Sequence, residues 1–161
     1  MMAGVFIREF IQEDKNNVLD LFRLNTPAFF SPEEEKDLIY YLDNEIEKYY
    51  VVLIDGKIAG CGGINFKENG EIGLLSWDFL HPHNQRMGVG TALLNHRIEI
   101  LKSIPSVKKI RVRTSQHAYT FYEKGGFVLF EKIKDYWAVG FDLYSMEYRS
   151  NIIDEKSHLA Q

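Results

Sequence analysis

Two tight-turn dipeptides, Asp55-Gly56 and Asn69-Gly70, each lie between runs rich in apolar residues. Asp-Gly and Asn-Gly supply the positive φ angles that two-residue hairpin turns need, so each dipeptide is typical of two antiparallel strands joined by a short turn. The runs that flank them are residues 50–54, 57–66 and 71–80. The sequence therefore predicts three antiparallel strands in series, and the other elements have to pack against the sheet that these strands begin.

Four segments predict helices. Ser31 suits an N-cap and Pro32 the first helical position, and a stripe at helical spacing follows them: Leu38, Leu42, Ile46 and Tyr49. The other three helices are expected at residues 13–24, 89–104 and 118–124, and further strands at residues 5–10, 109–114, 127–132 and 139–148. This order, β-α-α-β-β-β-α-β-α-β-β, indicates an α/β fold with a mixed, mostly antiparallel central sheet of about seven strands and helices on both faces.

The length favours one domain. A chain of 161 residues can bury roughly 70% of its unfolded surface around a single core. No repeat, low-complexity tract or linker divides the sequence. We therefore expect a single domain over residues 1–149 and a polar C-terminal tail over residues 150–161.

Charge and composition restrict the partners and the compartment. A net charge of -4 and a pI near 5.7 argue against a general nucleic-acid-binding protein. The single cysteine, Cys61, has no partner for an internal disulfide, which suits a reducing compartment. The first residues turn acidic too soon for a signal peptide, and no apolar run approaches the roughly 18 residues of a membrane span. We expect a cytoplasmic protein with no nucleic-acid partner and no membrane partner.

A glycine-rich turn, QRMGVG at residues 85–90, leads from a strand into the 89–104 helix. Free backbone N–H groups and the helix dipole make the start of such a helix favourable for a phosphate. A P-loop would need Lys before Thr91, and a dinucleotide fingerprint would need a third glycine at Leu93 and an acid at the end of the next strand. Neither is present, and a tight strand-to-helix turn explains the glycines equally well.

A second motif, FYEKGGF at residues 121–127, follows the next strand. Together the two motifs closely resemble the signature of the GNAT N-acetyltransferase superfamily, and the order of expected elements is similar to that fold over residues 5–148. Gln85, Gly88 and Gly90 fill the first motif; Phe121, Tyr122, Glu123, Lys124, Gly126 and Phe127 fill the second. The resemblance implies the GNAT acyl-CoA N-acyltransferase fold, with acetyl-CoA as acyl donor.

The resemblance also implies where the cofactor binds. The pyrophosphate would rest on backbone N–H groups from Arg86 to Thr91, and side chains on the two glycines would hold the phosphates away. The end of the preceding strand would pair with the pantetheine arm and hold the thioester carbonyl. The residues assigned to the cofactor in this way are Phe79, Leu80, Gln85, Arg86, Met87, Gly88, Val89, Gly90, Thr91, Ser115 and Phe121.

Acetyl transfer from a thioester to an amine needs a neutral amine and a protonated leaving group. Tyr122 matches the family tyrosine whose phenol faces the CoA sulfur, a suitable general acid, although a packing role suits it too. The positions of the family's glutamate bases are taken here by Leu74 and Arg111. Asp78 is the candidate base, on the expectation that it projects on the same face of its strand as Leu74; a structural acceptor at the strand end is the alternative.

The acceptor side is expected around Tyr136 and Trp137, which the resemblance places in a loop beside the acceptor, unless this loop simply packs on the sheet. The leading hypothesis is transfer to a primary amine of a small molecule. A protein N-terminal or lysine acetyltransferase and a non-catalytic acyl-CoA-binding domain are the alternatives. No group of His, Cys, Asp and Glu has metal-ligand spacing, so we expect no metal. We also allow for a homodimer.

Overall fold

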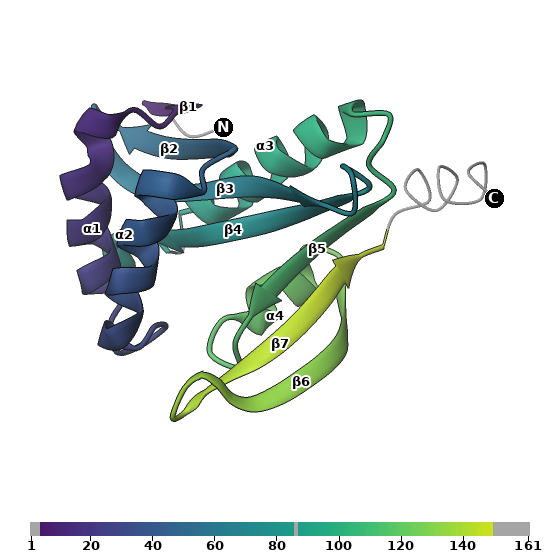
Figure 1. Cartoon of the computed structure of the whole chain (residues 1–161). Coiled ribbons are helices and arrows are strands. Elements are labelled where there is room, and N and C mark those ends of the chain that lie inside the picture. The colour runs from purple at the N-terminus through teal and green to yellow at the C-terminus, as the bar shows by residue number, and fades with distance from the viewer. Residues whose placement is uncertain (1–3, 86, 150–161) are drawn as a thin grey trace.

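The computed structural model describes residues 4–85 and 87–149. Within them lies a seven-stranded sheet in the order β1-β2-β3-β4-β5-β7-β6, in which only β4 and β5 run parallel. The strands are β1 Val5–Glu9, β2 Lys48–Ile54, β3 Lys57–Lys67, β4 Ile72–Leu80, β5 Lys109–Thr114, β6 Phe127–Ala138 and β7 Phe141–Tyr148. The predicted fold class, a mixed and mostly antiparallel sheet of seven strands, is confirmed (Figure 1).

Helices cover both faces of the sheet, and each face has its own core. The helices are α1 Lys15–Leu24, α2 Glu35–Asn44, α3 Val89–Ser103 and α4 Tyr119–Lys124, with single 3-10 turns at Gln12–Asp14, Pro32–Glu34 and Pro82–Asn84. The apolar stripes of α1 and α2 bury against one face, around Phe22, Leu38 and Val51. Those of α3 and α4 bury against the other, around Leu93, Leu101 and Ile110. Within residues 4–85 and 87–149, no helix is long and apolar enough to cross a membrane.

Two predicted boundaries are wrong. Helix α2 ends at Asn44, so Ile46 lies beyond it and Tyr49 belongs to β2. The aromatic and β-branched run after residue 48 favours a strand and overrides the helical spacing. Strand β6 continues to Ala138, which pairs with Phe141 after a register shift beyond Ile133. Residues 133–138 are therefore strand rather than loop.

The sheet opens between β4 and β5. Their pairing runs from Ile72↔Lys109 to Leu75↔Val112 and, among the residues that the structure describes, no β5 residue pairs with β4 beyond Leu75. In Figure 1 the unit β5-β7-β6 turns away from β1-β4 beyond this point. The last residues of β4 therefore border a gap in the sheet, with their backbone available on that side.

A bulge in β4 changes which way its side chains point. Trp77 has a positive φ of 46°, and the register with β3 shifts between Cys61 and Gly63. Leu75 packs in the core under α3, and after the bulge Asp78 contacts α3 as well. Simple alternation placed Asp78 on the face of Leu74; that expectation is wrong, because the extra residue at the bulge reverses the alternation.

Candidate active site

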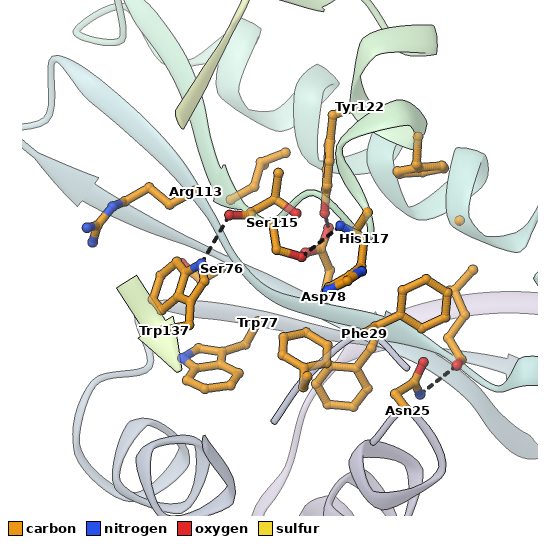
Figure 2. Close-up of a pocket in the computed structure, with 18 of the residues that line it drawn as sticks. Asn25, Phe29, Ser76, Trp77, Asp78, Arg113, Ser115, His117, Tyr122 and Trp137 are labelled. Atoms are coloured by element: carbon orange, nitrogen blue, oxygen red, sulfur yellow. Dashed lines mark hydrogen bonds between the residues drawn. The ribbon is translucent and has the colours of Figure 1, made fainter. Parts of the chain in front are cut away.

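The opening between β4 and β5 is part of one cavity of about 570 Å³. Residues from both faces of the sheet line it, from the start of α3 and α4 on one side to the α1–α2 connection on the other (Figure 2). Of the residues singled out in the sequence, those that line it are Asp78, Phe79, Leu80, Gln85, Gly90, Ser115, Phe121, Tyr122 and Trp137. The volume lies in the ordinary range of small-molecule sites.

The remaining predicted residues lie near the cavity without lining it. Met87 is half exposed, Val89 is buried in the core under α3, and Tyr136 is exposed on β6. Gly88 and Thr91 belong to the start of α3. Arg86 lies outside the described residues. The side chains of the 85–90 turn thus contribute little to the lining of the cavity. A ligand would contact the backbone of this turn.

The two glycines of the turn are needed for different reasons. Gly88 is the N-cap of α3 in the left-handed conformation, with φ 78°, which residues with side chains rarely adopt. A Cβ at Gly90 would lie 2.9 Å from Leu80 Cδ1 and 3.2 Å from the Phe121 ring. Gly90 therefore allows close packing at the cavity wall, a reason separate from the room for phosphates that the resemblance implies.

The start of α3 offers unpaired donors. Among the residues that the structure describes, none accepts a hydrogen bond from the backbone N–H of Val89 or Thr91. The 15-residue helix directs its dipole at the same place. Free N–H groups and the positive end of a helix dipole together suit an anion.

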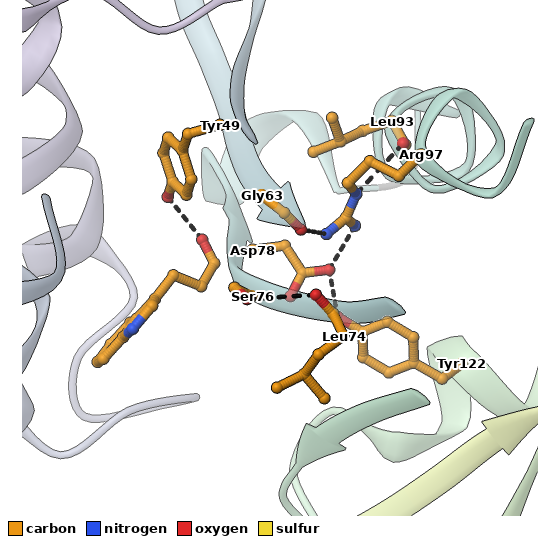
Figure 3. Close-up of polar contacts among 9 residues, drawn as sticks. Tyr49, Gly63, Leu74, Ser76, Asp78, Leu93, Arg97 and Tyr122 are labelled. Carbon is orange, nitrogen blue, oxygen red and sulfur yellow. Dashed lines mark hydrogen bonds and ion pairs between the residues drawn. The ribbon is translucent and has the colours of Figure 1, made fainter. Parts of the chain in front are cut away.

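Asp78 and Tyr122 are in direct contact at the centre of the cavity lining (Figure 3). The Tyr122 hydroxyl donates to Asp78 Oδ2, and Arg97 Nη2 donates to the same oxygen at 2.6 Å. Tyr122 is 5% exposed, and burial followed by the negative charge of Asp78 raises its pKa well above the usual value. The phenol therefore holds its proton at neutral pH, as a proton donor must.

Arg97 is the partner that sequence reasoning missed. Its side chain is 1% exposed, and it also donates to the carbonyl oxygens of Gly63 and Leu93. Burial alone would lower the pKa of Arg97, but the negative charge of Asp78 and its hydrogen bond raise it overall. A Cβ on Gly62 would lie 2.7 Å from Asp78 Cβ and 3.0 Å from Arg97 Nη1, so this glycine makes room for the pair.

Two signals in the sequence pointed to this pair. Arg97 lies four residues after Leu93 and four before Leu101, in the middle of the apolar stripe of α3. A charged side chain at a core position needs a buried partner. The glycines at 62 and 63 inside a predicted strand are typical of a place where another group approaches the backbone closely.

The side of the cavity under α1 and α2 is largely aromatic. Phe30 stacks on Trp77 with ring centroids 6.1 Å apart, and both pack around Phe22 and Phe79. Trp137, on β6, lines the cavity beside the end of β5, where its Nε1 donates to the Thr114 carbonyl at 3.1 Å. These rings form an apolar wall, of which sequence reasoning had singled out Phe79, for the cofactor, and Trp137, for the acceptor.

Polar groups are set into this aromatic wall. Asn65 Oδ1 accepts from the hydroxyls of Tyr41 at 2.6 Å and Ser76 at 2.8 Å. Asn25, at the end of α1, donates to the Leu80 carbonyl at 2.9 Å and so ties α1 to the end of β4. The Glu34 carboxylate, which accepts a hydrogen bond from the Ser31 N–H in the 3-10 turn before α2, also lines the cavity, and burial raises its pKa.

The two arginines of β5 are engaged with β6 and β7. Arg111, at a position where a family base was expected, pairs with Glu147 at 2.9 Å. Arg113 donates to the Tyr136 hydroxyl at 2.7 Å and lies over the rings of Tyr136 and Trp137. Tyr136 thus holds Arg113 at the rim of the cavity. Within the described part of the chain, no cluster of three His, Cys, Asp or Glu residues is arranged to hold a metal ion.

Comparisons with known proteins give a family match and a related sequence. The model of the family described as "Acetyltransferase (GNAT) family" matches residues 18–127. The amino-acid acetyltransferase of Pseudomonas fluorescens (strain Pf0-1) is 30% identical over 124 residues, which are 74% of this chain and 27% of that protein. The chain therefore spans about a quarter of the length of that relative.

Solved structures share the fold at low sequence identity. The ribosomal-protein-S18-alanine N-acetyltransferase from Escherichia coli superposes with a TM-score of 0.73 at 21% identity, over 89% of this chain and 92% of that one. The spermidine N-acetyltransferase from Vibrio cholerae, in complex with CoA and spermine, gives 0.69 at 16% identity, over 91% and 95% of the two chains. At these identities the likeness concerns the fold.

Proposed function

Because the chain belongs to the acetyltransferase (GNAT) family, we propose that it transfers an acetyl group from acetyl-CoA to a primary amine of a small molecule. One observation carries the proposal. A phenol that holds its proton and a carboxylate in contact with it line the same cavity that reaches the start of α3. An acid, a base and an anion-binding helix start are what acetyl transfer from a CoA thioester requires.

The donor lies on the α3–α4 side. We assign the pyrophosphate to the backbone N–H groups from Arg86 to Thr91, where Val89 and Thr91 have donors without a described acceptor. The pantetheine arm follows the end of β4 that has no β5 partner, near Phe79 and Leu80, and passes Ser115 and Phe121. That a relative of the same fold is known in complex with CoA supports this assignment.

The chemistry is assigned to two side chains. Asp78 takes the proton from the attacking amine, and Tyr122 protonates the departing sulfur. A backbone N–H near Leu80, in the gap where β4 has no β5 partner, donates a hydrogen bond to the carbonyl oxygen and stabilises the negative charge that develops on it. No metal takes part in this scheme.

The acceptor lies on the aromatic side, between Trp77, Phe30 and Trp137. Aromatic walls favour an amine with an apolar body, and a cationic amine gains further from the ring faces before it loses its proton. The cavity of about 570 Å³ suits a small molecule or the end of a peptide. Acetylation of a protein N-terminus or lysine is therefore the second candidate; the Escherichia coli neighbour with the same fold is named for such a reaction.

The acyl donor and the single cysteine bear on the compartment in which we place the protein. Acetyl-CoA as substrate and one cysteine, buried as a free thiol, are consistent with a cytoplasmic protein. We assign the activity to a single domain over residues 1–149, which contains every residue of the proposed site.

Release of free CoA thiol tests the proposal. The purified protein is mixed with acetyl-CoA and a panel of small amines, amino acids and peptides, with mass analysis of the products. We expect amine-dependent thiol release and an N-acetylated product, fastest for amines with an aromatic or aliphatic body. Faster turnover of peptides than of all small amines would favour the second candidate. CoA binding without turnover of any amine would indicate a binding domain and contradict the proposal.

A further inference from the structure

One carboxylate on the acceptor side of the cavity has no positive partner. Glu34, in the 3-10 turn before α2, is 7% exposed and lines the cavity. Its Oε2 accepts from the Ser31 N–H at 2.9 Å. In the part of the chain that the structure describes, no Lys, Arg or His forms an ion pair with it. Arg23, on the neighbouring helix α1, pairs with Glu35 instead.

The second oxygen of Glu34 is open to the cavity. Among the described residues, none donates a hydrogen bond to Oε1. In the same part of the chain no buried polar side-chain atom lacks a hydrogen-bond partner. Since Oε1 has no partner, it is not buried, and the space beside this residue is the cavity that it lines. Oε1 can therefore accept from a donor that the protein itself does not supply.

An aromatic path leads from Asp78 to Glu34. Trp77 precedes Asp78 in β4 and stacks on Phe30, with ring centroids 6.1 Å apart. The peptide N–H directly after Phe30 is the one that binds Glu34 Oε2. Figure 2 shows Trp77 on the side of Asp78 where α1 and α2 lie. An amine that reacts beside Asp78 can thus extend along these rings toward Glu34.

We propose that Glu34 binds a positive group at the far end of the acceptor, so that the substrate is an amine with a second cationic group, such as a diamine or an aminoalkylguanidine. The inference rests on the proposed function and names the class of small amine within it. One end of the acceptor reacts beside Asp78, its apolar chain lies along the rings of Phe30 and Trp77, and its second cation donates to Oε1 of Glu34.

A second cation supplies the partner that this carboxylate lacks. A buried carboxylate is costly unless it is paired and hydrogen-bonded. Burial raises the pKa of Glu34, and the negative charge of Asp37 adds to the rise. An ammonium or guanidinium group against Oε1 favours the charged carboxylate instead, through opposite charge and a charge-assisted hydrogen bond. The ring faces of Phe30 and Trp77 attract the same cation.

A helix cap alone does not account for this arrangement. Ser31 and Glu34 form a capping box, in which the glutamate side chain accepts from the N–H of the N-cap residue. That role occupies only Oε2, and a glutamine would serve it as well, because its amide also offers an oxygen. The cap therefore explains neither the charge nor the open oxygen of Glu34.

The other charged side chains of the cavity do not favour either sign. Apart from the ion pair under α3, they are Glu45, Lys67 and Arg113, and all three are exposed. Water and salt screen exposed charges far more than buried ones. With one carboxylate and two cations, this exposed group does not select a positive acceptor. Glu34 is buried, so its charge acts at closer range on a ligand in the cavity.

Matched pairs of acceptors test the second charge. Aminoalkylguanidines of increasing chain length are compared with aminoalkylureas of the same length, which have nearly the same shape and no charge; the guanidinium keeps its charge at neutral pH. Release of CoA thiol at saturating acetyl-CoA gives kcat/KM for each amine. At the best length we expect the guanidine to be preferred by about 10–100-fold, as for a hydrogen bond to a charged group. Equal values, or a preference for the urea, at every length would overturn the inference.

Glu34→Gln assigns this preference to one side chain. The substitution keeps an oxygen for the cap and removes the charge, so the guanidine-to-urea ratio of kcat/KM should fall until the preference disappears. Glu33→Gln is the matched control, because it removes the same charge from an exposed neighbour that does not line the cavity, and it should keep the ratio. The ratio compares two substrates of one preparation, so partial unfolding cancels. An unchanged ratio in Glu34→Gln, or an equal fall in both variants, would overturn the inference.

A measurement on the wild type covers the case in which Glu34→Gln does not fold. General attraction of cations by a protein of net charge -4 weakens as salt rises, whereas a contact with a buried carboxylate is screened much less. The guanidine-to-urea ratio should therefore persist at high salt, and a ratio that disappears there would overturn the inference. A wild type that acetylates no amine at all would contradict the proposed function. Turnover of neutral amines without a preference for the guanidine would overturn only the inference.

Discussion

The two sides of the cavity are built on opposite principles. The donor side, under α3 and α4, places charge at its centre: a buried arginine, a carboxylate and a phenol joined through one oxygen. The acceptor side, under α1 and α2, is an aromatic wall around Trp77 with hydrogen-bonded polar groups set into it, the Glu34 carboxylate among them. The buried ion pair thus lies on the donor side, and the aromatic surface faces the acceptor. In our proposal the reaction belongs to the first side and the choice of amine to the second.

Arg97→Met is expected to have the largest effect on stability. Removing one partner of a buried ion pair typically costs about 3–5 kcal/mol, because the remaining charge stays buried. Urea unfolding measures the change. The matched control is Arg23→Met, since Arg23 pairs with Glu35 but its side chain is 53% exposed; its free energy of unfolding should change far less. Equal losses from the two variants would contradict the buried charge on the donor side.

Acetyl-CoA should stabilise the protein through the donor side. At a hundredfold excess over Kd, a ligand that binds only the folded state adds about 2.7 kcal/mol. For a domain of this size that raises Tm by roughly 5–10 °C. Thermal unfolding with acetyl-CoA, ATP and NAD, each at the same concentration, measures the change in Tm. A shift from ATP or NAD as large as that from acetyl-CoA would contradict the assignment of the donor.

Gly88→Ala tests whether the turn before α3 contributes to CoA binding as well as to stability. The left-handed conformation costs a residue with a side chain about 1–2 kcal/mol, so the variant should be less stable and should bind CoA roughly tenfold more weakly, about 1.4 kcal/mol. Gly56→Ala is the control: Gly56 has φ 80° with nothing near its missing Cβ. It should lose similar stability, with CoA affinity, measured by calorimetry, unchanged. Weaker CoA binding in both variants would show that the backbone strain, and not the turn at α3, sets affinity.

Trp137→Leu should produce the smallest effect, confined to the acceptor side. Loss of one aromatic wall is worth about 0.5–1.5 kcal/mol, so KM for the amine should rise between roughly twofold and tenfold while CoA affinity stays the same. Val139→Ser, in the adjoining turn and 88% exposed, is the control and should change neither quantity. An unchanged KM in Trp137→Leu would show that the amine does not bind against Trp137.

The fold could be predicted almost entirely from local patterns. Hairpin turns at Asp55-Gly56 and Asn69-Gly70 predicted the pairing of β2, β3 and β4, and the apolar stripe predicted α3; the pairings of β1 with β2 and of β5 with β4 and β7 were not predicted. The errors were at boundaries, where strand pairing extended β6 to Ala138 and tertiary context ended α2 at Asn44. Such boundaries depend on neighbours that a sequence window does not contain.

The two sides of the site differed in how far the sequence revealed them. The donor side rests on two contiguous motifs, so its residues could be singled out. The orientation of Asp78 could not, because the bulge at Trp77 reverses the alternation of β4. The acceptor side is assembled from the α1–α2 connection, β3, β4 and β6, and no short motif marks such a set. Arg97 was visible in principle, as a charge inside an apolar stripe.

The binding of a conjugate that joins the two sides tests the central claim, one cavity with donor and acceptor on opposite sides of β4. The best amine of the panel is linked through an acetyl bridge to the sulfur of CoA, and its Kd is compared with that of CoA by calorimetry. If both sides are engaged at once, linkage should tighten binding by about 10²–10⁴-fold, and Trp137→Leu should weaken the conjugate without affecting CoA. A conjugate that binds no more tightly than CoA itself would contradict the account.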